Sequence, residues 1–191
     1  MNDAQLRSAV RERLLRKYGG RPDTLLVEEL GLRHGASRVD LALVNGCLEG
    51  FELKSDRDRL TRLARQADVY GTVLDRVTLV AGQRHVAHAF DLIPAWWGVV
   101  CVTRAKGDAL RMILVRPAQE NPGVDPLALA KLLWREEALR ALARRGAAAG
   151  FLSARRSTLY ERLSTILTLV ELKGLVRSTL RGRTMWRSGA P

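Results

Sequence analysis

Two neighbouring segments near the start of the chain alternate between apolar and polar residues. Residues 37–44 read S-R-V-D-L-A-L-V, and residues 48–55 alternate less strictly. A period of two is typical of a half-buried β-strand. Asp40, Glu52 and Lys54 are charged positions inside these segments, and a charge on a core-facing strand is unfavourable unless a partner compensates it. These three residues are therefore candidate site residues.

The hydrophobic pattern predicts further elements on both sides of these strands. Before them it predicts a helix over 4–18 and a strand over 24–32. After them it predicts a helix that is capped by Ser55 and has its apolar stripe over 60–74, followed by a strand over 77–81. It also predicts a hairpin, in which a strand over 98–103 is joined by a turn at 106–108 to a second strand over 110–115. The order of elements indicates an α/β domain.

The strand patterns end before Asn121-Pro122-Gly123, and only helical patterns follow. Asp125 and Pro126 are suited to the N-cap and first position of a helix that runs toward Gly146. Two more helical stretches cover about 157–172 and 171–180. We therefore divide the chain into an α/β domain over 1–120 and a helical region over 121–191.

The turn between the two charged strands decides which of their side chains share a face. A two-residue turn at Asn45-Gly46 would place Asp40 opposite Phe51 and leave Glu52 on the other face. A three-residue loop over 44–46 shifts the register by one and places Asp40 opposite Gly50, on the face of Glu52 and Lys54. We favour the second register because it collects the three ionisable groups.

These residues occur in an order that is similar to that of a known nuclease superfamily. Asp40 is followed by Glu52-Leu53-Lys54, then by Gln66 and Tyr70 in Q-x-x-x-Y spacing. This set resembles the PD-(D/E)XK nucleases of the RecB-like branch, and P-A-W-W-G at 94–98 extends the likeness to small bacterial sce-type proteins of unassigned role. The proline of the motif is absent, since Val39 precedes Asp40.

The resemblance implies a fold, a cofactor and a set of site residues. The implied core is a helix, a three-stranded antiparallel meander, a helix and a strand. Asp40, Glu52 and the main-chain carbonyl of Leu53 would bind Mg²⁺ or Mn²⁺, and the catalytic set would be Asp40, Glu52, Lys54, Gln66 and Tyr70. Lys54 would stabilise negative charge on phosphorus, or act as a base if desolvation lowers its pKa.

Other acidic residues are weaker candidates. Glu29 or Glu28, in the strand over 24–32, would be a further ligand, and we assign Glu29 to the metal site. Glu12 lies off the apolar stripe of the first helix and is expected to face solvent. The simplest non-catalytic interpretation is a Glu52–Lys54 salt bridge on a solvated strand face.

The net charge of +12 is concentrated at the end of the chain. Residues 1–130 hold 19 basic and 16 acidic side chains, whereas residues 131–191 hold 13 and 4. Such a surplus favours a polyanionic partner. The predicted nucleic-acid-binding residues are Arg144, Arg145, Arg155, Arg156, Arg177, Arg181 and Arg183.

Composition narrows the functional class. No apolar run approaches the roughly 20 residues of a membrane helix, and two cysteines without C-x-x-C spacing favour a reduced cytoplasm and argue against a zinc site. We expect a cytoplasmic, metal-dependent deoxyribonuclease without a membrane partner. The alternatives are a catalytically silent nuclease fold that binds DNA or a protein through its basic region and, less favoured, a winged-helix-like regulator.

Overall fold

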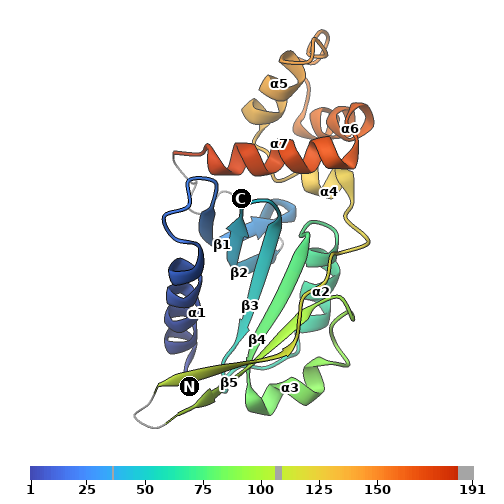
Figure 1. Ribbon diagram of the computed structural model, residues 1–191. Helices are drawn as coiled ribbons and strands as arrows, with labels where there is room; N and C mark the ends of the chain where they lie inside the picture. Colours follow the sequence, from blue (N-terminus) through green and yellow to red (C-terminus); the bar gives the residue numbers. More distant parts are fainter. Residues whose placement is uncertain (36, 106–108, 185–191) are drawn as a thin grey trace.

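A mixed β-sheet runs through the centre of the molecule, with helices on both faces and a cap of helices at one end (Figure 1). This computed structural model describes residues 1–35, 37–105 and 109–184. The strands are β1 (Leu25–Leu32), β2 (Ser37–Val44), β3 (Leu48–Lys54), β4 (Arg76–Gly82), β5 (Gly98–Arg104) and β6 (Leu110–Arg116). The helices are α1 (Asp3–Tyr18), α2 (Leu63–Gly71), α3 (Gln83–Ala89), α4 (Pro126–Ala130), α5 (Arg135–Ala143), α6 (Arg156–Ile166) and α7 (Leu169–Arg181), with a 3₁₀ turn at Arg33–Gly35.

The strands follow one another across the sheet in sequence order. β1, β2 and β3 form an antiparallel meander, β4 and β5 join it in parallel, and β6 pairs antiparallel with β5. The mixed α/β class and the order helix, meander, helix, strand are confirmed. The sheet among the described residues has six strands, because the hairpin partners β5 and β6 extend the same sheet. The predicted turn at 106–108 lies outside the described residues.

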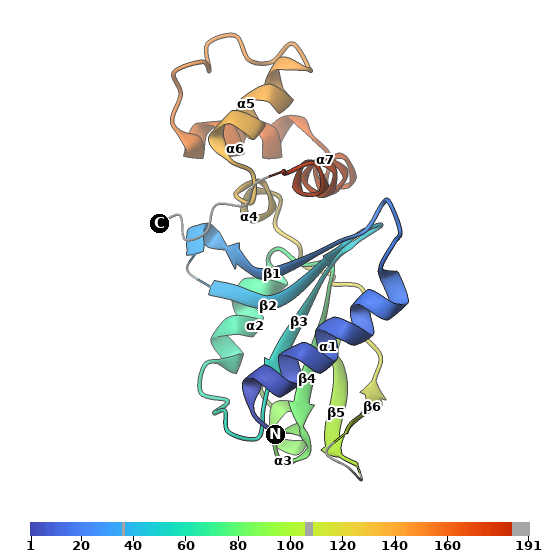
Figure 2. The ribbon, with the colours of Figure 1, turned by 90° about the vertical axis from the view of Figure 1, so that its left-hand side faces the viewer.

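Helices cover the two faces of the sheet with separate apolar clusters (Figure 2). On one face, α1 buries Leu6, Val10 and Leu14 against apolar residues of β2, β3, β4 and β5. On the other face, α2 packs against the sheet in a larger cluster. Trp97 is fully buried there and stacks on the ring of Tyr70, with centroids 5.9 Å apart. Among the described residues, no helix has the length and apolar character needed to cross a membrane.

The helices after residue 121 share their core with the sheet. The larger cluster contains residues of α2 and β4 as well as Leu133, Leu159 and Val176 of the C-terminal region. α7 lies across the end of the sheet, and its Lys173 forms an ion pair of 2.7 Å with the buried Asp75, which precedes β4. The C-terminal region is thus packed directly on the predicted nuclease-like domain.

Three local expectations were wrong in detail. The helix predicted after Ser55 begins at Leu63; at Ser55 the chain forms a turn, in which the Asp58 amide donates to the Ser55 carbonyl (3.2 Å). α4 begins as predicted at the Asp125 cap, but it ends at Ala130, and α5 is a separate helix. Residues 83–89, for which no element was expected, form α3.

The β2–β3 register differs from both expectations. Ala42 lies opposite Gly50 and Val44 opposite Leu48, so the loop covers residues 45–47. The Asn45 side chain fixes this loop by accepting the amide of Cys47 (3.0 Å). The loop has three residues, as expected, but the register is shifted by two. An even shift preserves which residues share a face.

Candidate functional site

A buried acid–base pair lies at the end of β3. Glu52 is 1% exposed and Lys54 is 7% exposed, and the Lys54 ammonium donates to Glu52 Oε1 at 2.5 Å. Both side chains point to the same face because they are two residues apart on a strand. The simplest non-catalytic interpretation placed this pair on a solvated strand face. The pair is instead buried.

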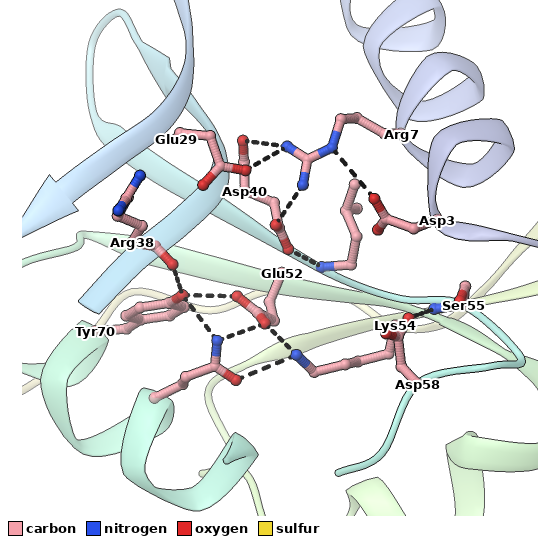
Figure 3. Close-up of polar contacts among 12 residues, drawn as sticks. Asp3, Arg7, Glu29, Arg38, Asp40, Glu52, Lys54, Ser55, Asp58 and Tyr70 are labelled. Carbon is pink, nitrogen blue, oxygen red and sulfur yellow. Dashed lines mark hydrogen bonds and ion pairs between the residues drawn. The ribbon is translucent and has the colours of Figure 1, made fainter. Parts of the chain in front are cut away.

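Two side chains of α2 complete this polar group (Figure 3). Gln66 donates from Nε2 to Glu52 Oε1 (2.7 Å) and accepts from Lys54 at 3.2 Å. Tyr70 lies one turn further along the helix, with its hydroxyl 2.7 Å from Glu52 Oε2. The structure thus brings together four of the five predicted catalytic residues, and we call Glu52, Lys54, Gln66 and Tyr70 the Glu52 cluster.

The Tyr70 hydroxyl is also 2.5 Å from the carbonyl oxygen of Arg38. A hydroxyl carries one proton, so it can donate to only one of these two acceptors. Both short contacts are satisfied when Glu52 is protonated and donates to Tyr70. The pKa of Glu52 is raised from its ordinary value, chiefly by burial and further by the charge of Asp40, while Lys54 opposes the rise. Burial and the carboxylate of Glu52 also raise the pKa of Tyr70, which stays a neutral donor.

Asp40 belongs to a second polar group, on the side of α1. Its Oδ1 accepts from the Arg7 guanidinium (2.7 Å), which also forms an ion pair of 2.9 Å with Glu29. Asp40 Oδ2 accepts the backbone amide of Leu53 at 2.8 Å. This bond attaches the Asp40 side chain to β3 at the residue that follows Glu52. The two carboxylates lie close enough for the charge of Asp40 to affect the pKa of Glu52.

A break in strand alternation separates the two groups. Val39 and Ala42 both pack in the cluster on the α2 face, whereas Leu41 packs on the α1 face. The β1–β2 ladder skips Asp40 and the facing Glu29, whose φ is +52°. Strict alternation would place the Asp40 side chain with that of Ala42. The irregularity instead directs it to Arg7, which was missed in the sequence because it only flanks the apolar stripe of α1.

The oxygen donors around Leu53 match the ligand preference of a hard divalent cation. They are the carboxylates of Asp40 and Glu52, together with the main-chain carbonyl of Leu53 implied by the family resemblance. A cation between two nearby carboxylates is favourable because it offsets the repulsion between their charges. Within residues 1–35, 37–105 and 109–184, no cluster of three or more His, Cys, Asp or Glu side chains is arranged to hold a metal. A metal here would depend on the two carboxylates and the carbonyl.

The remaining acidic candidates lie outside the Glu52 cluster and outside the polar group of Asp40, or at the margin of these groups. Glu12 is exposed and accepts from Ser8 (3.1 Å), as expected for a solvent-facing residue. Glu28 pairs with Arg11 at the surface. Glu29, assigned to the metal site, reaches Asp40 only through Arg7 and is about half exposed.

The predicted nucleic-acid-binding arginines fall into two groups. Arg183 is buried against Glu137, Arg177 faces Asp75 at 3.5 Å, and Arg181 donates to the carbonyls of residues 23 and 45. These three hold the C-terminal helices together or attach them to the sheet. The exposed group consists of Arg144, Arg145, Arg155 and Arg156.

Comparison with known proteins places the chain in one family. Residues 1–189 match the model of the family described as bacteriophage P4 protein cII, and the chain therefore belongs to that family. Protein cII of Enterobacteria phage P4 is 33% identical over 86 residues. That alignment covers 45% of this chain and about a third (33%) of the phage protein. No solved structure matches the chain.

Proposed function

We propose that this protein is a metal-dependent nuclease that hydrolyses phosphodiester bonds of DNA. The observation that carries the proposal is the buried Glu52 cluster with Asp40 beside it. A buried lysine and glutamate held by a glutamine and a tyrosine, next to a second carboxylate, form a polar group that simple packing does not require. The same residues, on a helix, meander, helix, strand framework, resemble the PD-(D/E)XK superfamily.

In this proposal each residue has a distinct task. Asp40, Glu52 and the Leu53 carbonyl bind the cation, which would polarise the scissile phosphate and lower the pKa of a bound water. Lys54 places its positive charge where negative charge develops on phosphorus. Gln66 fixes Lys54 and Glu52 relative to each other through its two hydrogen bonds. Tyr70 holds the second oxygen of Glu52.

The decisive assay measures cleavage of single-stranded, duplex and branched DNA in Mg²⁺, Mn²⁺ or EDTA. We expect cleavage with either metal and none in EDTA. Glu49→Gln is a matched control for Glu52→Gln, because Glu49 lies on the same strand and is also partly buried, but outside the cluster. Equal activity of the two variants would contradict the proposal.

One observation favours a second function, that of a catalytically silent nuclease fold that binds DNA. The Arg7 guanidinium already neutralises Asp40 and occupies its Oδ1. A cation would have to share this carboxylate with Arg7. In the silent version wild-type protein binds DNA in every metal condition and cleaves in none. Cleavage gained by Arg7→Met would show that the Arg7–Asp40 ion pair keeps the site silent.

A further inference from the structure

A cationic cavity lies in the C-terminal region, away from the Glu52 cluster. It has a volume of about 570 Å³ and is formed by the segment between α4 and α5 together with the start of α6. Four of its eight lining residues are basic and none is acidic. The basic residues are Lys131, Arg135, Arg155 and Arg156. Like charges gathered around one hollow repel each other, so the arrangement favours an anion in it.

The charges that line the cavity are not neutralised within the described part of the chain. Lys131, Arg155 and Arg156 form no ion pair with any carboxylate there. Arg135 donates to the carbonyls of Leu152 (2.6 Å) and Ala154 (3.3 Å), which hold its guanidinium in place without cancelling its charge. This differs from Arg183, whose charge is compensated by Glu137. Within the described residues, the cationic side chains of the cavity therefore have no ion-pair partner.

Hydrogen-bond donors are added by the start of α6. The N-cap residue of this 11-residue helix is Arg155, which provides no side-chain acceptor to the first turn. Ser157 in that turn and Ser153 before it also line the cavity. Amides at the start of a helix and hydroxyl groups are both common phosphate donors. Guanidinium groups add bidentate contacts.

We infer that this cavity binds a phosphate group of a nucleic acid. The choice of nucleic acid rests on the proposed function, and the cavity is a contact beyond the cleavage site. Its volume exceeds that of one phosphate, so the attached sugar also fits. The phosphate is either internal to the strand or at its 5′ end.

The test is DNA binding by full-length protein in EDTA, where the proposed cleavage does not occur. Fluorescence anisotropy compares wild type, Arg155→Gln/Arg156→Gln and the control Arg13→Gln/Arg16→Gln. The control removes the same charge from exposed positions of α1, outside the cavity and outside the predicted nucleic-acid-binding residues. Each lost duplex phosphate contact lowers the slope of log affinity against log salt by roughly 0.9. We expect the cavity variant to lose about 0.9, corresponding to the one phosphate in the cavity, and the control much less.

Two further arms separate the sources of the phosphate. Tighter binding of a 5′-phosphorylated strand than of its 5′-hydroxyl form, lost in the cavity variant, identifies a terminal phosphate. Equal binding of the two strands, weakened equally in that variant, identifies the backbone. The inference is overturned if the cavity variant matches wild type, if the control loses as much slope, or if inorganic phosphate is bound at the cavity and DNA is not. Absence of metal-dependent cleavage with intact cavity binding would refute the proposed nuclease and leave this inference standing.

Discussion

Two buried acid–base pairs in this protein have nearly the same exposure and very different surroundings. Glu52–Lys54 in the sheet has side chains 2% and 8% exposed, and Glu137–Arg183 in the C-terminal region has side chains 4% and 5% exposed. Glu137 accepts two bonds from Arg183 and one from the amide of Trp134. The Arg183 guanidinium also lies 4.3 Å from the centre of the Trp134 ring. This second pair attaches the segment after α7 to the start of α5.

The difference lies in whether the cation can lose its charge. An arginine keeps its proton in a protein, whereas a buried lysine can lose it. Glu137 and Arg183 therefore form a fixed structural link. Glu52 is instead a carboxyl group whose pKa burial raises, and it lies beside a second carboxylate, that of Asp40. Burial of charge alone does not indicate a reactive site; a buried carboxyl group with a raised pKa beside a second carboxylate is a better indicator.

Breaking the fixed pair is expected to have the largest effect. Glu137→Ala removes the carboxylate that accepts two bonds from the buried Arg183 guanidinium, which should lower the free energy of unfolding by about 3–5 kcal/mol. At 2–4 °C per kcal/mol, Tm should fall by roughly 6–20 °C. Thermal unfolding followed by circular dichroism measures it. Glu137→Met/Arg183→Met should recover much of the loss, and a double variant as unstable as the single one would contradict this reading.

Breaking the titratable pair should affect activity more than stability. Glu52→Gln keeps the shape of the side chain and an oxygen that can accept from Lys54, so we expect less than about 2 kcal/mol of destabilisation. Metal-dependent cleavage should fall at least about 100-fold, the usual loss when one preorganised electrostatic group is removed. Parallel melting curves and cleavage rates test both halves. A fall in Tm as large as that of Glu137→Ala would mean that the Glu52 cluster is structural.

A third buried acid lies between these two cases. Asp75 accepts the Leu48 amide (2.7 Å) and pairs with Lys173 and Arg177 of α7. Asp75→Asn retains one acceptor for Leu48 but loses its charge, so we expect a loss of about 1.5–3 kcal/mol, the range for charged hydrogen bonds. Lys173→Met on its own should cost less, since Arg177 remains. Limited proteolysis between the sheet and α7 should be faster in Asp75→Asn, and unchanged cleavage sites would argue against this attachment.

The smallest expected effect is a pH dependence that separates the two pairs. The pKa of Glu52 is raised in the folded protein, so the native state binds its proton more tightly than the unfolded chain. Stability from this group is present below pH 4.5 and is lost as pH rises from there through the raised pKa. In metal-free buffer, the Tm of wild type should therefore fall relative to that of Glu52→Gln as pH increases. A constant difference from pH 4 to 8 would show that Glu52 titrates normally.

The sequence predicted the elements well because their patterns are local. The stripe of Leu6, Val10 and Leu14 reflects burial of one face of α1, and the apolar residues over 37–44 form a strand that packs on both sides of the sheet. The Gln66 and Tyr70 spacing likewise placed both side chains on one face of α2, toward Glu52. Local signals of this kind can be recognised without knowledge of the rest of the chain.

The failures concern contacts between distant segments. Alternation predicts a shared face for Asp40 and Glu52, but the irregularity at Glu29 and Asp40 depends on how β1 and β2 pair. Net charge also did not show that Arg177, Arg181 and Arg183, predicted to contact nucleic acid, engage Asp75, backbone carbonyls and Glu137 within the protein. Net charge only counts basic and acidic residues. The tertiary structure shows which basic side chains already have partners within the protein.

The ion pairs between Asp75 and α7 have a consequence for synthesis of the chain. Asp75 leaves the ribosome about 100 residues before Lys173 and Arg177, its cationic partners. At the usual 5–20 residues per second, the nascent sheet waits roughly 5–20 s for them. During this interval the Asp75 carboxylate and the apolar surface later covered by α7 are open to water. The nascent chain is therefore expected to bind a holdase chaperone until α7 emerges and docks.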